Sequence, residues 1–245
     1  MKTAWIEIET ADGGMHAYLA EPDGGGPYPG IVVLQEAFGV NAYVRSVCER
    51  LADVGYVAVA PELFHRTEIH FEVPYDDREH ALAALGAVTN DTLEQDIGAA
   101  LAALRAKPEV APARVAVLGF CMGGFGAILA GLTSAVAAIV AFYPGGLVRA
   151  RPPLKLSPLL DRIPELRAPV LLNFGGDDFA IPPEDVEAVR IALGHSKSLH
   201  EIVVWPGAKH GFHTQDRTPA YDPHTAERAW HGTLAWLETV LRSAP

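Results

Sequence analysis

The chain has 245 residues, of which 49% are hydrophobic, and a formal net charge of −11. The hydrophobic content is ample for a buried core, and the length fits one large α/β domain as well as two small ones. The acidic balance argues against nucleic acid or a membrane as a partner, because phosphate-driven binding needs a basic surface. Two cysteines far apart in the sequence make no disulfide framework. No apolar run suits a signal peptide or a membrane span, so we expect a reducing, cytoplasmic location.

Apolar patterning divides the chain into alternating strands and helices. The predicted strands cover residues 5–9, 15–20, 31–34, 56–60, 115–118, 136–142, 170–174 and 199–205. The predicted helices cover residues 78–85, 91–104, 184–193 and 224–241. One further helix is expected to end near residue 53, and another to follow residue 121. The first two strands alternate apolar and polar side chains about a glycine-containing turn, as an antiparallel hairpin at a sheet edge does. The rest predicts an α/β fold with a mostly parallel, doubly wound sheet, and we expect residues 1–245 to form a single domain.

The connection between residues 61 and 90 is long, polar and irregular in its first half. Such a segment is typical of an active-site loop. At its end, Asp91 followed by Glu94 predicts a capping box at the start of the next helix.

A short motif after the strand over residues 115–118 indicates the chemistry. Gly119-Phe120-Cys121-Met122-Gly123 has the pattern of a nucleophile elbow, with cysteine where serine is usual. The two glycines remove side chains that would clash in the sharp turn. Cys121 would lie at a helix N-terminus, where free N–H groups and the helix dipole favour a thiolate. The alternative is a small buried cysteine in an ordinary turn.

Two later strand ends carry an acid and a base. Asp177 and Asp178 follow the strand over 170–174, and His210 follows the last strand. Because parallel strands end at the same edge of a sheet, these side chains should gather near Cys121. His210 would move a proton between the thiol and a leaving group, and one aspartate would fix the imidazole tautomer. Each residue alone fits a turn or a surface loop, but the order nucleophile, acid, histidine is that of α/β hydrolases.

These motifs resemble the dienelactone hydrolases (carboxymethylenebutenolidases), a family with the α/β-hydrolase fold and a Cys-His-Asp triad. The resemblance runs through nearly the whole chain, over residues 35–41, 119–124, 176–182 and 207–210. It implies cleavage of a lactone or activated ester through a thioester on Cys121, without a metal or organic cofactor. It also selects Asp178 over Asp177, since the family's aspartate lies four residues before the proline of its loop, here Pro182.

The resemblance implies further roles around the nucleophile. Glu36 would contact the resting thiol and take its proton, and the backbone N–H groups of Ala37 and Met122 would form the oxyanion hole. From the residues alone, a carboxylate in an apolar loop would have a raised pKa, although Glu36 could also serve only to start a helix. The candidates for substrate contact are Tyr143, Arg78, Phe38 and Phe212.

One departure from the family concerns substrate recognition. Well-known members bind a substrate carboxylate through arginines, one of them shortly after the catalytic histidine. Here His210 is followed by residues without a guanidinium until Arg217, and Arg78 resembles the other arginine only loosely. The substrate could therefore be a lactone, or the protein could be a broad-specificity carboxylesterase. The other alternative is a catalytically silent relative that binds a ligand or partner. We expect a small-molecule substrate and a monomer or small homo-oligomer.

Overall fold

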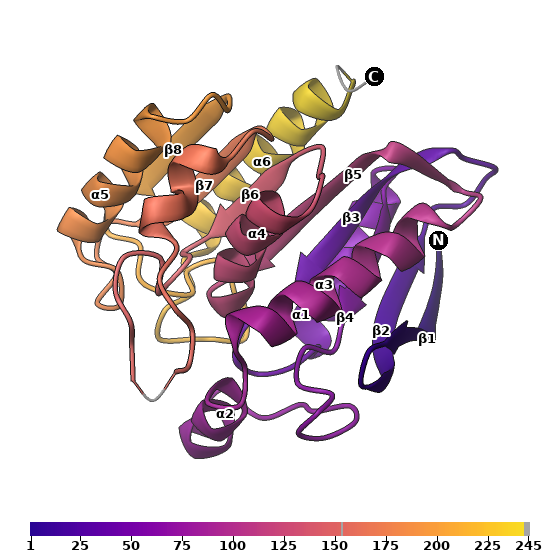
Figure 1. Ribbon diagram of the computed structural model, residues 1–245, viewed down its shortest axis with the longest axis horizontal. Coiled ribbons are helices and arrows are strands. Elements are labelled where there is room, and N and C mark those ends of the chain that lie inside the picture. Colours follow the sequence, from indigo (N-terminus) through magenta and orange to yellow (C-terminus); the bar gives the residue numbers. More distant parts are fainter. Residues whose placement is uncertain (153, 243–245) are drawn as a thin grey trace.

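The computed structural model describes residues 1–152 and 154–242, so residues 153 and 243–245 of the predicted 1–245 domain lie outside the described residues. Eight strands form one sheet in the order β1-β2-β4-β3-β5-β6-β7-β8 (Figure 1). Their bounds are β1 (Lys2–Thr10), β2 (Gly13–Glu21), β3 (Tyr28–Leu34), β4 (Val57–Pro61), β5 (Val110–Phe120), β6 (Ile139–Phe142), β7 (Val170–Gly175) and β8 (His200–Trp205).

The strand pairing confirms the predicted α/β-hydrolase sheet. β1 and β2 form an antiparallel hairpin at one edge, β2 pairs antiparallel with β4, and every other neighbouring pair is parallel. β5 begins earlier than predicted, because Val110 pairs with Tyr28 beyond an irregularity in the ladder. The residues between Val110 and the buried part of β5 are mostly exposed, so they carry no apolar signal.

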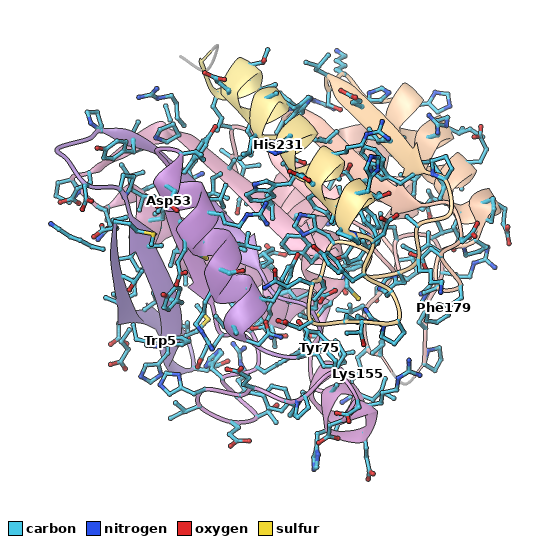
Figure 2. All side chains as sticks on the ribbon, turned by 180° about the vertical axis from the view of Figure 1, so that it is seen from behind. Trp5, Asp53, Tyr75, Lys155, Phe179 and His231 are labelled. Atoms are coloured by element: carbon cyan, nitrogen blue, oxygen red, sulfur yellow. The ribbon has the colours of Figure 1, made fainter. Side chains whose placement is uncertain are left out.

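Helices cover both faces of the sheet, as a doubly wound fold requires. They are α1 (Ala42–Asp53), α2 (Arg78–Leu85), α3 (Asn90–Arg105), α4 (Met122–Thr133), α5 (Pro183–Gly194) and α6 (Pro223–Arg242), with a 3-10 helix η1 (Leu160–Glu165). α3, α4 and α5 lie on the face seen in Figure 1, and α1 and α6 lie on the face seen in Figure 2. Within residues 1–152 and 154–242, no helix is long and apolar enough to cross a membrane.

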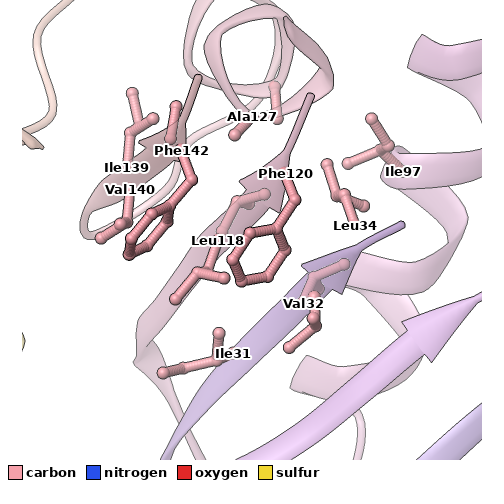
Figure 3. Packing of buried hydrophobic residues seen from close by; sticks show 14 of the residues in the cluster. Ile31, Val32, Leu34, Ile97, Leu118, Phe120, Ala127, Ile139, Val140 and Phe142 are labelled. Carbon is pink, nitrogen blue, oxygen red and sulfur yellow. The ribbon is translucent and has the colours of Figure 1, made fainter. Parts of the chain in front are cut away.

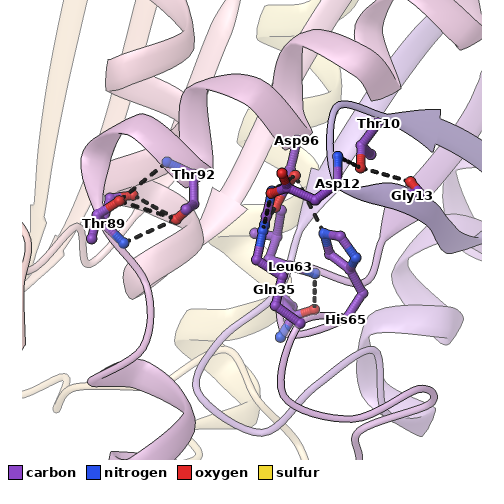
Figure 4. A network of polar contacts seen from close by, with 10 residues as sticks. Thr10, Asp12, Gly13, Gln35, Leu63, His65, Thr89, Thr92 and Asp96 are labelled. Carbon is purple, nitrogen blue, oxygen red and sulfur yellow. Dashed lines mark hydrogen bonds and ion pairs between the residues drawn. The ribbon is translucent and has the colours of Figure 1, made fainter.

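The start of α3 differs from the prediction. Thr89 caps the helix: its hydroxyl accepts a hydrogen bond from the Thr92 N–H at 3.2 Å, and the Thr92 hydroxyl accepts one from the Thr89 N–H at 3.0 Å (Figure 4). The predicted box of Asp91 and Glu94 is therefore wrong. Thr89 has the extended backbone typical of an N-cap residue. The Thr92 hydroxyl accepts the N-cap backbone N–H, a position usually filled by a Glu or Gln side chain.

The core directly beneath the nucleophile is aromatic. Phe120 ends β5 and Phe142 ends β6, and their rings stack with centroids 5.0 Å apart (Figure 3). Both are fully buried, as are Leu118 on β5 and Val32 on the neighbouring β3. Parallel strands buried on both faces leave little freedom at their carboxyl ends, so this packing fixes the height at which the chain turns into α4.

Candidate active site

The turn between β5 and α4 has the geometry of a nucleophile elbow. Cys121 lies between the two elements with φ 53° and ψ −113°, a strained conformation for a residue with a Cβ. Its N–H donates to the Phe142 carbonyl at 3.0 Å. A Cβ on Gly119 would lie 2.0 Å from the Gly123 oxygen, and one on Gly123 would lie 2.3 Å from the Leu34 oxygen. The steric requirement predicted for the two glycines is therefore confirmed.

The loops after β7 and β8 bring the acid to the base. His210 Nδ1 lies 2.8 Å from Asp178 Oδ2, and both side chains are buried. The other oxygen, Asp178 Oδ1, accepts the backbone N–H groups of Ala180 at 2.7 Å and Ile181 at 3.2 Å. Asp177 is exposed, and its backbone N–H donates to the Ala208 carbonyl at 2.9 Å. Of the two adjacent aspartates, Asp178 is thus the one whose carboxylate contacts the imidazole.

The charge state of His210 depends on Cys121. Burial lowers the pKa of the imidazole, but the negative charge of Cys121 and the hydrogen bond to Asp178 outweigh burial and raise the pKa of His210 to about 10. A hydrogen bond to the Cys121 side chain acts in the same direction. The half-buried Cys121 side chain and the imidazole of His210 therefore lie within reach of each other.

Glu36 follows β3 and enters the same site from the other side. Its carboxylate is almost fully buried, and Oε2 accepts a hydrogen bond from the Thr214 hydroxyl at 3.0 Å. The resemblance implied contact with the thiol, whereas this hydrogen bond goes to Thr214. Arg217 Nη1 lies 3.9 Å from Oε1. Burial raises the pKa of Glu36, and the charges of Arg217 and His210 oppose that rise.

The two amides predicted for the oxyanion hole lie on adjoining segments. Ala37 is buried in the loop after β3, and Met122 is the first residue of α4, where helix N–H groups lack partners within the helix. The Gly123 N–H donates to the Gln35 carbonyl at 3.1 Å, which ties the two segments together. The Gln35 side chain in turn accepts the Leu63 N–H at 3.1 Å (Figure 4). Gln35 thus braces this region, a role that its sequence context did not indicate.

A cleft of about 810 Å³ opens beside His210. Its walls include Pro74, Tyr75, Arg78, Phe179, Lys209 and Arg217. Phe179, next to Asp178, is 80% exposed, and Figure 2 shows it and Tyr75 at the same end of the molecule. Arg78 therefore lies where the sequence predicts substrate contact. The cleft combines apolar walls with charges of both signs, because Asp76 and Asp216 line it as well. Such a cleft suits a small polar organic molecule or ester.

The remaining substrate candidates lie at different depths. Phe38 packs beneath the cleft wall, with its ring 4.6 Å from that of Tyr75 and 5.9 Å from the Arg217 guanidinium. Tyr143 and Phe212 are fully buried behind His210; the Tyr143 ring lies 5.0 Å from the imidazole and 5.4 Å from the Phe212 ring. Both rings pack against the segment that carries His210, and neither is exposed to solvent.

Thr214 is a further residue of the site to which no sequence motif points. It is fully buried, and its hydroxyl lies 3.2 Å from that of Tyr143 as well as 3.0 Å from Glu36. A threonine in a loop carries no motif signal, so only the folded contact reveals it. For the residues that the structure describes, no three His, Cys, Asp or Glu side chains are grouped as metal ligands.

Comparisons with known proteins agree with this geometry. A sequence model described as "Dienelactone hydrolase family" matches residues 15–241. A Synechocystis protein named a carboxymethylenebutenolidase is 32% identical over 244 residues, covering 99% of this chain and 98% of its own. A Bradyrhizobium protein named a 2-oxo-3-(5-oxofuran-2-ylidene)propanoate lactonase is 32% identical, covering 95% of this chain and 92% of its own.

A solved structure extends the comparison to three dimensions. A dienelactone hydrolase from Klebsiella pneumoniae superposes with a TM-score of 0.88 at 32% identity, covering 97% of this chain and 98% of that one. Sequence and fold therefore agree over almost the full length. The chain belongs to the dienelactone hydrolase family and is a lactone or ester hydrolase of that family.

Proposed function

We propose that this hydrolase cleaves a lactone or activated ester through a thioester on Cys121. The observation that carries the proposal is the 2.8 Å contact between His210 and Asp178 beside a cysteine held at a strained elbow. A thiolate forms a thioester readily but expels poor leaving groups badly, so enol lactones and activated esters are better substrates than peptides. A cysteine nucleophile also needs a reducing compartment, and we place the protein in the cytoplasm.

In the acylation step, the Cys121 thiolate attacks the carbonyl carbon and forms a C–S bond. The oxyanion that develops would accept hydrogen bonds from the N–H groups of Ala37 and Met122. When the intermediate collapses, the ester C–O bond breaks and the His210 imidazolium gives its proton to the leaving oxygen. For a lactone, that oxygen stays attached to the acyl group.

In the deacylation step, a water molecule attacks the thioester. His210, now neutral, takes one proton from the water, and the C–S bond breaks to release the carboxylic acid and the thiolate. Asp178 keeps the imidazole in the tautomer that can accept this proton and stabilises the charged form. His210 is again an imidazolium, and the Cys121 thiolate returns to the resting thiol when it takes up a proton.

We assign the proton of the resting thiol to Glu36. An imidazolium cannot accept a second proton, so a separate base suits the resting site. Glu36 lies close enough to interact with His210, and burial raises its pKa toward the range in which a carboxylate exchanges a proton with a thiol. Oε1 is the available oxygen: it is buried and accepts no hydrogen bond from the described residues.

The cleft supports a substrate with an anionic or polar end. Arg78 and Arg217 would face that end, and a guanidinium can bind both oxygens of a carboxylate. An alternative within the same chemistry is a broad-specificity carboxylesterase, in which neither arginine selects the substrate. Hydrolysis rates over a panel of carboxylated lactones, neutral lactones and aryl esters separate these readings, and turnover of none of them indicates a silent relative.

The test of the nucleophile uses the two cysteines of the chain. Cys121→Ala should abolish hydrolysis of 4-nitrophenyl acetate and remove the acyl adduct seen by mass spectrometry after rapid acid quench. Cys48→Ala is the matched control, because Cys48 is buried in α1 and should leave both signals in place. Turnover at the wild-type rate in Cys121→Ala would show that the elbow is not the site of attack.

A further inference from the structure

We propose that Thr214 is a positioning residue: it holds one oxygen of Glu36 and leaves the other free to accept the thiol proton. The proposal rests on the role given above to Glu36. Thr214 is fully buried and its hydroxyl lies 3.0 Å from Glu36 Oε2. Glu36 Oε1 is buried without a hydrogen bond from any described residue, and the Arg217 Nη1 atom stays 3.9 Å away from it.

Donor and acceptor counting fixes the direction of the hydrogen bonds. An ionised carboxylate only accepts, so the single hydroxyl hydrogen of Thr214 points to Glu36. The Tyr143 phenol is then left to donate, either to Thr214 across their 3.2 Å contact or to Glu36, whose pKa a hydrogen bond from Tyr143 also lowers. Burial, and after it the charge of Glu36, raise the pKa of Tyr143 well above its ordinary value, which keeps the phenol protonated and able to donate.

This chain of hydrogen bonds favours the basic form of Glu36. If the carboxyl were protonated on Oε2, it would have to donate to Thr214, and Thr214 would then donate to Tyr143, so Tyr143 could no longer donate to Thr214. When Tyr143 donates to Thr214, a proton on Glu36 Oε2 is disfavoured, whereas a proton on Glu36 Oε1 disturbs neither hydrogen bond. Thr214 thus opposes the effect of burial on the carboxylate and selects the oxygen that takes up the proton.

The backbone places Thr214 for this task. It lies in the turn that follows His210, where its N–H donates to the Gly211 carbonyl at 3.0 Å and its carbonyl accepts the Arg217 N–H at 3.0 Å. The Thr214 hydroxyl and the His210 imidazole are therefore carried by one short segment. Movement of that segment shifts the base and the support of Glu36 together.

The test compares Thr214→Val, which keeps the shape and removes the hydroxyl, with Thr214→Ser, which keeps the hydroxyl. The readout is the pH profile of kcat/KM for 4-nitrophenyl acetate. Loss of a hydrogen bond to a charged group should raise the pKa of Glu36 further, so the acid limb in Thr214→Val should move up by about one to two pH units. Thr214→Ser should restore the wild-type profile. At neutral pH, kcat should fall while KM changes little, because Thr214 is fully buried.

Other groups near Glu36 titrate or carry charge, and the comparison must hold them constant. They are Arg217, His210, Tyr143, Tyr43 and Tyr75. Both Thr214 variants leave all of them in place. If Thr214→Val does not fold, Tyr143→Phe removes the donor to Thr214 and should move the acid limb in the same direction by a smaller amount.

The outcomes separate this inference from the proposed function. If Glu36→Gln loses activity but Thr214→Val keeps the wild-type profile, Thr214 only packs and the inference is overturned. If Glu36→Gln keeps the acid limb and the activity, the assignment of Glu36 as the base fails first. A drop in the thermal midpoint of Thr214→Val with an unchanged acid limb also counts against positioning, because packing alone would produce it.

Discussion

Replacing Asp178 with Asn should disable His210 without disturbing the loop. Asp178 Oδ1 accepts two backbone N–H groups, at 2.7 and 3.2 Å, so in the variant the amide oxygen must occupy that place. The amide nitrogen then takes the place of Oδ2 and faces His210 Nδ1, 2.8 Å away in the wild type. Because an amide nitrogen donates, Nδ1 must become the acceptor, and the proton moves to Nε2. The imidazole is then locked in the tautomer that cannot act as a base.

The expected size of the effect distinguishes this mechanism from a simple loss of contact. Losing one hydrogen bond to a charged group costs about 1.5–3 kcal/mol, or roughly 10- to 150-fold in rate. A locked, wrong tautomer costs about 10⁴-fold, as known for the corresponding change in a serine protease triad, or about 5 kcal/mol. The pKa of His210 should also fall from its raised value of about 10, since the carboxylate beside it is lost.

The assay is kcat/KM for an activated ester, with thermal unfolding as a check on the fold. Asp177→Asn is the matched control, because Asp177 is exposed and its backbone N–H donates within the turn. We expect Asp178→Asn to lose about 10⁴-fold and the control to lose less than about tenfold. Equal losses in the two variants, or a loss of only tenfold at Asp178, would refute the tautomer argument.

Two further predictions follow from the geometry. Glu36→Gln keeps an oxygen for the Thr214 hydroxyl but removes the proton acceptor, so turnover should fall and the ultraviolet titration of the thiolate should shift; coincident titrations with unchanged turnover would leave His210 as the only activator. Gly123→Ala should lower the thermal midpoint and abolish turnover, because its Cβ would lie 2.3 Å from the Leu34 carbonyl oxygen; a variant with wild-type stability and turnover would contradict the steric argument. Gly98→Ala is its control, since no atom lies within 4 Å of the added Cβ.

The parts of the fold that the sequence predicts well are those with local causes. Continuous apolar runs mark the buried strands, and the two elbow glycines are required by contacts within one turn. The predictions fail where the signal is weak or ambiguous. The cap of α3 is a threonine pair rather than the acidic pattern beside it, and the exposed start of β5 has no periodicity.

The features of the site that could not be predicted from the sequence depend on contacts between distant segments. Thr214 lies 178 positions after Glu36, and no spacing rule connects a loop threonine to a strand-end carboxylate. The packing of Phe212 likewise involves Tyr143, which follows β6 and lies far from Phe212 in the sequence. Thr214 and the buried packing of Phe212 depend on contacts between distant segments, which no local motif encodes.

The missing arginine after His210 illustrates the same limit. The sequence places the next guanidinium, Arg217, too far along the chain to match the family pattern. In the fold, the turn through Gly211 brings Arg217 back, and a Cβ on Gly211 would lie 2.5 Å from Arg217 Nη1. Gly211 has φ +84°, a conformation that favours glycine, so the close return depends on that residue. The cleft therefore keeps a guanidinium 3.9 Å from Glu36, although the spacing along the chain has changed. The number of residues between His210 and Arg217 therefore does not show how close the guanidinium lies to the site, because the turn at Gly211 folds the chain back.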